Sequence, residues 1–336
     1  MICTRLIYVL LCAGLLNTGC RSGASSTEQT DNGSVQTQEG PTIKVPAFDA
    51  DKTYGYIKQQ VDFGPRVPNT SAQLKCADWM ELQLKASCDT VYRQQTQLLA
   101  GDKKTKLRCI NLIGVINPNA KQRILLLAHW DSRPWADQDV ANTNAPIDAA
   151  DDGASGVAVL IGIANQIKAN PLGNKDLGID ILLADVEDYG KSEWETNGNT
   201  SYALGTQYWA ENPHVPNYTA RAGILLDMVG GRNARFPLEG NSKQYAGNVQ
   251  QEVWKAGSEA GYSSYFVYAD GGTITDDHVP VLEILHIPTI DIIDLPTGTR
   301  TGFPAHWHTH NDNITAIDQS TLKAVGQTLL QYLYNQ

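Results

Sequence analysis

The chain has 336 residues, of which 42% are hydrophobic, 18% charged and 8% aromatic. This balance is typical of a globular protein and excludes a disordered tail, a coiled coil and a collagen-like rod. The 36 acidic residues outnumber the 26 basic ones and give a formal net charge of -10. Because no polycationic face is available to follow a phosphate backbone, we expect no nucleic-acid partner.

The N-terminal segment 1–19 has the pattern of an export signal. The basic residue Arg5 precedes an apolar run from Leu6 to Leu16, and the small residues Thr18 and Gly19 lie directly before Cys20. The run is shorter than the ~20 residues that span a bilayer, which makes a permanent transmembrane helix the weaker interpretation. Gly19-Cys20 resembles the lipobox of bacterial lipoproteins. The resemblance implies a signal peptide over 1–19, acylation of Cys20, attachment to a bacterial membrane and a periplasm-facing protein, with simple secretion as the alternative.

Segment 20–44 is mostly polar and has almost nothing to bury, so we expect a flexible tether before a folded part at 45–336. An odd number of cysteines in the folded part cannot all pair within one chain. If 71–86 is one helix, Cys76 lies ~15 Å or more from Cys88, beyond the ~7 Å that a disulfide bridges. We therefore expect free, buried thiols at Cys76, Cys88 and Cys109.

The folded part alternates between strand-like and helix-like segments. Two alternating segments that flank the polar turn 101–104 predict an edge hairpin, at 90–99 and 107–116. Apolar runs typical of buried central strands lie at 124–128, 179–184, 222–226 and 287–293. Helical spacing of apolar residues occurs at 154–167, 203–210, 247–260 and 322–333. The alternation predicts a single-domain α/β sandwich of three layers, with a mixed, twisted central sheet flanked by helices.

Candidate metal-binding residues follow the predicted strands. In an open α/β sheet, ligands bind beyond the carboxyl ends of the strands, so the polar residues just after each apolar run are the ones to inspect. These residues are His129 and Asp131, the acids of Asp185-Val186-Glu187-Asp188, Asp227, the trio His306, His308 and His310, and the pair Asp151-Asp152 before the helix at 154–167. Oxygen and imidazole ligands without thiolates suit zinc in a catalytic site.

Each group by itself has an ordinary alternative. His129-Trp130-Asp131 could be a surface pair, Asp151-Asp152 a helix N-cap, and Glu187-Asp188 a solvated turn. The three histidines alternate as on a strand or extended loop, which predicts that they point the same way, and the ordinary alternative is incidental surface. The joint occurrence of all groups after buried strands favours a metal site.

At these residues the chain resembles the co-catalytic zinc aminopeptidase superfamily and, within it, the animal-type glutaminyl cyclases and their bacterial relatives. The resemblance covers the folded part and implies a zinc-aminopeptidase-like fold. By analogy with the cyclases it implies one zinc ion, bound by Asp152, Asp188 and His308, with Glu187 as the proton-transfer residue. Asp188 stands where animal cyclases usually have glutamate. In the peptidases the similar positions hold a second metal, which here would be bound by His129, Asp152 and Asp227. Asp131 would orient these second-metal ligands.

Three further features resemble the cyclases rather than the peptidases. Trp307 precedes His308, and Trp194 follows Glu187 at the spacing of a second pocket tryptophan, so both are expected to line the substrate pocket. Asp276 opens an Asp-Asp-His-x-Pro motif whose first acid joins Glu187 and Asp227 in a hydrogen-bond chain. The ordinary alternative for Asp276-Asp277 is a helix N-cap. Ordinary core packing is expected for Trp130, Trp135 and Trp209.

The resemblance implies a glutaminyl-peptide cyclotransferase, which converts the N-terminal glutamine of peptides or proteins to pyroglutamate and releases ammonia. A di-zinc aminopeptidase uses nearly the same residues and is the first alternative. A lipid-anchored binding protein with an inactive site is the second.

Overall fold

The computed structural model describes residues 44–195 and 200–336, and a six-stranded sheet forms its centre. The expected signal 1–19, Cys20 and all of the expected tether except Lys44 lie outside these residues. The sheet order is β1-β2-β4-β3-β5-β8. The strands are β1 (Thr90–Leu99), β2 (Lys106–Ile116), β3 (Gln122–His129), β4 (Leu177–Ala184), β5 (Ala222–Asp227) and β8 (Thr289–Ile293). In the described part of the chain, no helix is long and apolar enough to cross a membrane.

The sheet is mixed, as predicted. β1 pairs with β2, and β2 with β4, in antiparallel fashion, so the hairpin forms one edge of the sheet. β4, β3, β5 and β8 run parallel to one another. The carboxyl ends of these four strands therefore meet at the same edge, where the sequence places its acids and histidines.

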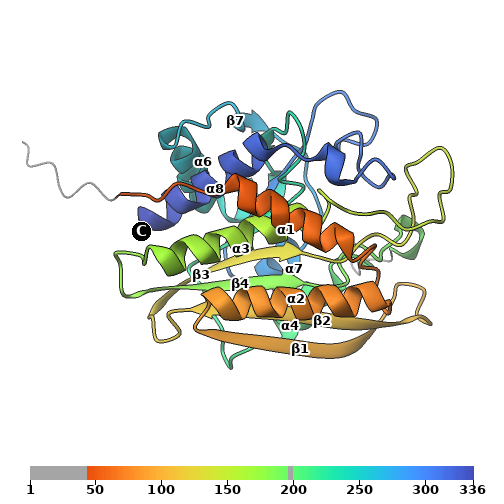
Figure 1. Ribbon diagram of the computed structural model, residues 1–336, viewed down its shortest axis with the longest axis horizontal. Helices are drawn as coiled ribbons and strands as arrows, with labels where there is room; N and C mark the ends of the chain where they lie inside the picture. The colour runs from red at the N-terminus through yellow and green to blue at the C-terminus, as the bar shows by residue number, and fades with distance from the viewer. Residues whose placement is uncertain (1–43, 196–199) are drawn as a thin grey trace, which may run out of the picture. The chain divides into compact units, whose positions relative to one another are not determined.

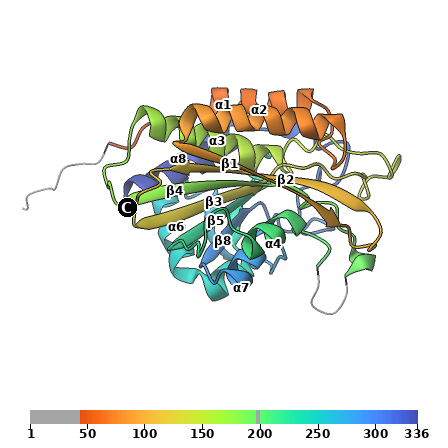
Figure 2. The same ribbon diagram turned by 90° about the horizontal axis from the view of Figure 1, so that it is seen from below.

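Helices cover both faces of the sheet (Figures 1 and 2). In Figure 2, α1 (Ala50–Asp62), α2 (Ser71–Ser87) and α3 (Ala154–Ala169) lie on one side, and α4 (Leu204–Glu211) and α7 (His278–Ile284) lie on the other. α8 (Gln319–Tyr334) packs on α1, α3 and α6 (Gly247–Glu259). These contacts confirm the three-layer sandwich.

The alternation of side chains along β3 explains the two layers. Ile124, Leu126 and Ala128 belong to the larger apolar core, under α3 and α8. Leu125 and Leu127 belong to a smaller core with Trp209 of α4 and Val281 of α7. Because successive side chains of a strand point to opposite faces, an unbroken apolar run is needed to bury both.

The elements absent from the sequence prediction include α1, the short helix α5 (Gly240–Tyr245), and the two-stranded sheet of β6 (Phe236–Leu238) and β7 (Phe266–Asp270). α1 is mostly polar and contains Gly55, an unfavourable residue inside a helix. It forms because Asp49 caps its first turn and its apolar side packs on α3. The strands β6 and β7 are too short for their period to be visible.

Two core predictions are confirmed and one is wrong. The three cysteines are free and buried, and Trp130 and Trp209 are fully buried. Trp135 is only half-buried, and its ring packs edge-on against Tyr189 and Trp194. It lies on the loop after β3, where the sequence offers no periodicity from which to judge burial.

Candidate metal centre

The parallel strands bring the predicted acids and histidines together at one edge of the sheet. His129 is the last residue of β3 and Asp227 the last of β5. Asp188 follows β4, Asp152 precedes α3, and His308 lies on the loop between β8 and α8. All five side chains are buried. Residues up to 179 positions apart in the sequence thus share one site, because β3, β4 and β5 end side by side and two loops bring Asp152 and His308 to the same edge.

Two sets of side chains converge closely enough to hold a metal ion, and they share Asp152. One is Asp152, Asp188 and His308, and the other is His129, Asp152 and Asp227; in each set the ligand atoms lie within 4.8 Å of one another. In the first set, His308 Nε2 is 3.3 Å from Asp188 Oδ1 and 3.6 Å from Asp152 Oδ2. In the second, His129 Nε2 is 3.0 Å from Asp152 Oδ1 and 3.3 Å from Asp227 Oδ1.

The chemistry of these atoms fits a cation. Asp188 Oδ2, Asp227 Oδ1 and both ring nitrogens of His129 are buried without a hydrogen-bond partner. Buried polar atoms are rarely left unpaired in a native protein. Burial, together with the neighbouring charge of Asp188, raises the pKa of Asp152 to about 6. The cluster is therefore short of positive charge, which a divalent ion would supply.

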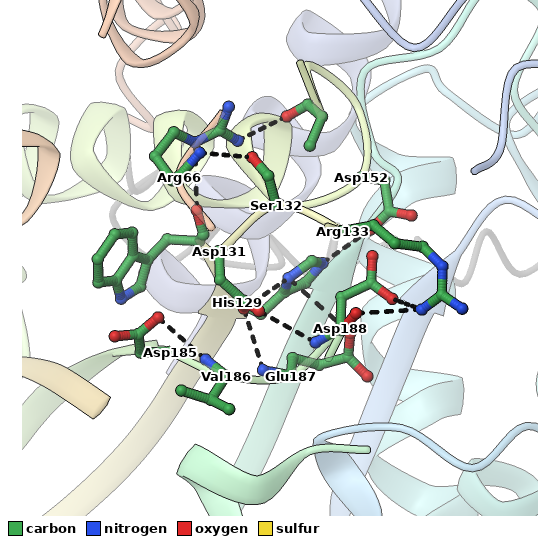
Figure 3. A network of polar contacts seen from close by, with 12 residues as sticks. Arg66, His129, Asp131, Ser132, Arg133, Asp152, Asp185, Val186, Glu187 and Asp188 are labelled. Carbon is green, nitrogen blue, oxygen red and sulfur yellow. Dashed lines mark hydrogen bonds and ion pairs between the residues drawn. The ribbon is translucent and has the colours of Figure 1, made fainter. Parts of the chain in front are cut away.

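The turn after β4 is held in shape by Asp131 (Figure 3). Asp131 Oδ1 accepts a hydrogen bond of 3.0 Å from the backbone N–H of Glu187, and Oδ2 accepts one of 3.1 Å from that of Asp188. Its Oδ1 also lies 3.4 Å from His129 Nδ1. Asp131 thus contacts His129 and orients the turn that carries two site acids.

Backbone strain accompanies this turn. Val186 has φ of 58°, a conformation that a β-branched residue rarely adopts. The hydrogen bond from its N–H to Asp185 Oδ1 helps to hold it there. Met228, directly after Asp227, and His308 have φ of 47° and 55°. Such strained residues persist only where the surrounding structure fixes them, and they gather at functional sites.

Glu187 lies beside the convergent sets without belonging to either. Its Oε2 is 4.0 Å from His129 Nδ1. Burial raises the pKa of Glu187 well above its usual range; His129 opposes this shift, and the charges of Asp188 and Asp276 reinforce it. Burial likewise raises the pKa of Asp227 to about 6 and that of Asp276. The site therefore contains buried carboxyl groups whose pKa is shifted upward, the direction that suits a proton-transfer residue.

These groups open into a cavity of about 350 Å³. Its acidic lining includes Glu187, Asp227 and Asp276, and its apolar lining includes Ile293, Phe303 and Trp307. Trp307 stacks on Phe303 with ring centroids 4.4 Å apart and on His308 at 3.6 Å. A wall of this kind suits a small, compact ligand with polar groups at one end.

Trp194 occupies a different place. It is not among the residues that line this cavity in the described part of the chain. Its ring packs edge-on against Trp135, and its Cβ lies against the Gly101 turn of the β1–β2 hairpin. Tyr202 takes part in the cavity wall in this region. The role of Trp194 as a pocket residue stays a prediction.

Sequence reasoning missed Arg133 and Asp137. The guanidinium of Arg133 donates hydrogen bonds to both carboxylate oxygens of Asp137, at 2.8 and 2.6 Å, and to Asp188 Oδ1 at 2.7 Å. Asp137 Oδ1 lies 3.2 Å from His308 Nδ1. The only signal in the sequence was the position of Arg133 four residues after His129, next to a motif already singled out.

Asp312 is a third residue that sequence reasoning missed. Its Oδ1 accepts a hydrogen bond of 2.8 Å from the N–H of Asp151, and its Oδ2 accepts one of 3.2 Å from that of Asp152. Burial and the charges of these two acids raise the pKa of Asp312 to about 7. Asp312 thus fixes the backbone of the shared candidate ligand.

The three histidines do not point the same way, so that expectation is wrong. They lie on turns rather than on a strand. His306 Nε2 contacts Asp151 Oδ2 at 2.8 Å, and the exposed His310 contacts Asp139 at 2.7 Å. Only His308 faces the convergent acids. A turn has no period of two, so sequence spacing does not fix the direction of its side chains.

Helix capping does not account for the acidic pairs. Gly153, with φ of 106°, is the N-cap of α3, and Asp277 is the N-cap of α7; neither helix receives a side-chain hydrogen bond from its cap. Asp151 instead accepts a hydrogen bond from the N–H of Gly230 at 2.7 Å. Asp276 Oδ1 accepts one from the N–H of Asp277 at 2.5 Å.

Comparison with known proteins agrees with this geometry. The model of peptidase family M28 matches residues 111–333, more than half of the chain. A solved structure of a glutaminyl cyclase from Bacteroides thetaiotaomicron, bound to N-acetylhistamine, is 47% identical, with a TM-score of 0.83 over 87% of this chain and 100% of that one. A structure from Parabacteroides distasonis described as a Zn-dependent exopeptidase is 49% identical, with a TM-score of 0.83 and the same coverage.

A curated relative from animals is more distant. The glutaminyl-peptide cyclotransferase of Gloydius blomhoffii is 28% identical over 254 residues, which make up 66% of this chain and 65% of that protein. The chain thus spans just under two thirds of the length of this relative. With the family match and the bacterial structures, the chain belongs to peptidase family M28 and, within it, to the branch that includes the bacterial glutaminyl cyclases.

Proposed function

We propose that this protein is a zinc-dependent glutaminyl-peptide cyclotransferase, which converts the N-terminal glutamine of peptides or proteins to pyroglutamate and releases ammonia. The main support for the proposal is one small cavity. It is lined by Asp152, Asp188 and His308, which form a set of two carboxylates and one imidazole. The separate carboxyl group of Glu187 and an apolar wall that includes Trp307 complete it. The bacterial relative described as a glutaminyl cyclase supports the same activity.

The reaction itself explains why such a site suffices. The α-amine of the glutamine attacks the carbon of its own γ-carboxamide, a C–N bond forms, and the bond to the amide nitrogen breaks. Because nucleophile and electrophile belong to one residue, no enzyme nucleophile is required. The protein has to fold the side chain back, accept the charge that grows on the carbonyl oxygen, and move one proton from the amine to the leaving nitrogen.

The residues of the cavity divide these tasks. Asp152, Asp188 and His308 would hold a single zinc ion, which supplies Lewis acidity toward a carbonyl oxygen. Glu187 would take the proton from the α-amine and return it to the leaving nitrogen as ammonia departs. Asp276 and Asp227 line the same cavity, and the charge of Asp276 helps to raise the pKa of Glu187, which suits a residue that accepts a proton and returns it.

The aromatic wall would give the reaction its selectivity. Trp307 and Phe303 stack on each other at one side of the cavity, and Ile293 adds a further apolar surface. These side chains would pack on the methylene groups of the glutamine and limit the access of water, which would otherwise hydrolyse the amide. A cavity of about 350 Å³ lies at the small end of ligand sites.

A substrate assay tests this proposal. The purified protein is incubated with a peptide that begins with glutamine, and ammonia release is measured together with the peptide mass. Loss of one ammonia from an otherwise intact peptide supports cyclisation. Release of free glutamine from the same peptide contradicts it.

A di-zinc aminopeptidase is the second candidate, because the set His129, Asp152 and Asp227 also converges. Metal analysis and an aminoacyl chromogenic substrate separate the two. One zinc ion per chain and no release of amino acid favour the cyclotransferase, whereas two ions with amino-acid release favour the peptidase.

We also propose that the protein is exported and anchored to a bacterial membrane by a lipid on Cys20. The support is the basic and apolar start of the chain followed by Gly19-Cys20, with a polar stretch behind it. Metabolic labelling with a fatty acid, compared between the wild-type protein and Cys20→Ala, tests this. Equal labelling of the two proteins would contradict it.

A further inference from the structure

We propose that Arg133, together with Asp137, positions two of the three zinc-binding side chains. In this proposal Arg133 makes Asp188 bind the ion through Oδ2 alone, and Asp137 makes His308 bind it through Nε2. Both are positioning residues, because neither belongs to the converging ligand sets. The inference rests on the zinc site of the proposed function and goes beyond it by naming what fixes the geometry of that site.

The first contact acts on Asp188 (Figure 3). Arg133 Nη1 donates to Asp188 Oδ1 at 2.7 Å and to the backbone carbonyl oxygen of Asp188 at 3.1 Å. Oδ2 of the same carboxylate is buried and has no hydrogen-bond partner. One oxygen is thus occupied by the guanidinium, and the other is left for the ion.

The second contact acts on His308 through Asp137. Asp137 Oδ1 lies 3.2 Å from His308 Nδ1, and Asp137 accepts both hydrogen bonds of a bidentate pair with Arg133. A carboxylate beside Nδ1 favours the tautomer that carries its proton there. Nε2 then presents a lone pair to the oxygens of Asp152 and Asp188, an arrangement of acceptors only, which a cation between them would stabilise.

The environment explains why arginine occupies this position. Its side chain is 1% exposed and lies between two carboxylates, and its guanidinium stands over the ring of Trp135, with Cζ 5.4 Å from the ring centroid. A planar guanidinium can serve Asp188 and both oxygens of Asp137 at once, whereas a lysine ammonium acts as a point charge. A single methylene group joins the carboxylate of Asp188 to its backbone, so fixing this carboxylate sets the ligand position directly.

Zinc affinity tests the inference without any substrate. The affinities of the wild-type protein, Arg133→Lys and Asp137→Asn are compared by competition with a chromogenic chelator. We expect each variant to bind zinc about 10- to 100-fold more weakly, the usual effect of removing a group that orients a metal ligand. We also expect the visible spectrum of the Co²⁺-substituted protein to change in both, because the ligand geometry changes.

Arg123 provides the matched control. It also forms a bidentate pair, with the buried Asp180 at 2.6 and 2.7 Å, but it lies at the other end of β3. Arg123→Lys should lose stability and keep the zinc affinity of the wild type. Equal losses of zinc affinity in Arg123→Lys and Arg133→Lys would overturn the inference, because they would indicate a general effect of weakening a buried pair.

Variants at both Arg133 and Asp137 are tested, so that the inference can still be decided if one variant does not fold. If Arg133→Lys does not fold, Asp137→Asn decides, since its side chain is 37% exposed and its replacement is isosteric. Wild-type zinc affinity and an unchanged cobalt spectrum in folded Asp137→Asn would overturn the inference. Normal zinc binding without cyclisation of a glutamine peptide would overturn the proposed function alone.

Discussion

Replacement of Gly156 by alanine should push α3, which begins two residues after Asp152, away from the sheet. Gly156 lies in the first turn of α3, where a Cβ would stand 2.4 Å from the carbonyl oxygen of Leu226 and 2.9 Å from Ala128 Cβ. The first distance is about 1 Å short of the 3.4 Å at which ordinary van der Waals contact begins. The obstacle is backbone, so a rotamer change cannot relieve it.

The magnitude follows from two opposing effects. Alanine is favoured over glycine inside a helix by about 1 kcal/mol, whereas overpacking a core costs up to about 3 kcal/mol. We therefore expect Gly156→Ala to lower the free energy of unfolding by about 2 kcal/mol. Leu226 and Ala128 directly precede Asp227 and His129, so the same displacement should also move Asp152 away from the candidate ligands on the sheet.

Urea unfolding and zinc content after dialysis against a weak chelator measure both effects. Gly55→Ala is the matched control, because Gly55 is also inside a helix and a Cβ there would have no neighbour within 4 Å. This control should gain about 0.5–1 kcal/mol and keep its zinc. If Gly156→Ala is as stable as the wild-type protein and retains zinc, the close approach of α3 to β5 is not what positions Asp152.

Two further predictions concern Glu187 and His308 of the cavity, and a third concerns the buried acid Glu239 elsewhere in the chain. Glu187→Gln should keep zinc, because Glu187 is outside both convergent sets, and should lower kcat by about 10²- to 10⁴-fold through loss of proton transfer; full activity would remove Glu187 from the mechanism. His308→Ala should lose zinc in a metal analysis of the purified protein, and zinc content equal to that of the wild type would contradict its role as a ligand. Burial alone would raise the pKa of Glu239, but contact with His278 and hydrogen bonds from Ser242 lower it to about 2. A depressed carboxyl pKa stabilises the fold above the unfolded-state value of about 4.3, and this contribution is lost as the pH falls toward 2. In urea unfolding, Glu239→Gln should therefore cost up to about 3 kcal/mol at pH 7 and clearly less at pH 3, and a pH-independent difference would refute the assignment.

The sheet and the placement of most acids could be predicted from the sequence. Unbroken apolar runs identify strands buried on both faces, and helices between them force the strands to run parallel. The carboxyl ends of such strands meet at one edge, so residues that directly end a strand or follow it, such as His129, Asp188 and Asp227, are brought together by topology alone. No long-range contact had to be known to predict this.

Residues on loops could not be placed in the same way. The contact between Arg133 and Asp188 joins positions 55 residues apart, and that between His310 and Asp139 joins positions 171 apart. The spacing of Trp194 from Glu187 does not by itself show which way its ring points; in the structure the side chain lies against the hairpin turn at Gly101. Spacing along a loop does not determine the direction of a side chain, because the packing of other segments decides it.

The sequence by itself thus determined the layers of the fold, the edge at which the acids gather and the presence of metal-binding side chains. Only the tertiary structure decided which of His306, His308 and His310 faces those acids, and which groups hold them in place. The physical reason is the range of the interactions. The burial of a strand can be predicted from the local pattern of apolar residues. The orientation of His308 depends instead on Asp137, which Arg133 holds in place, and these residues meet only when β3, β4 and the loop before α8 are packed together.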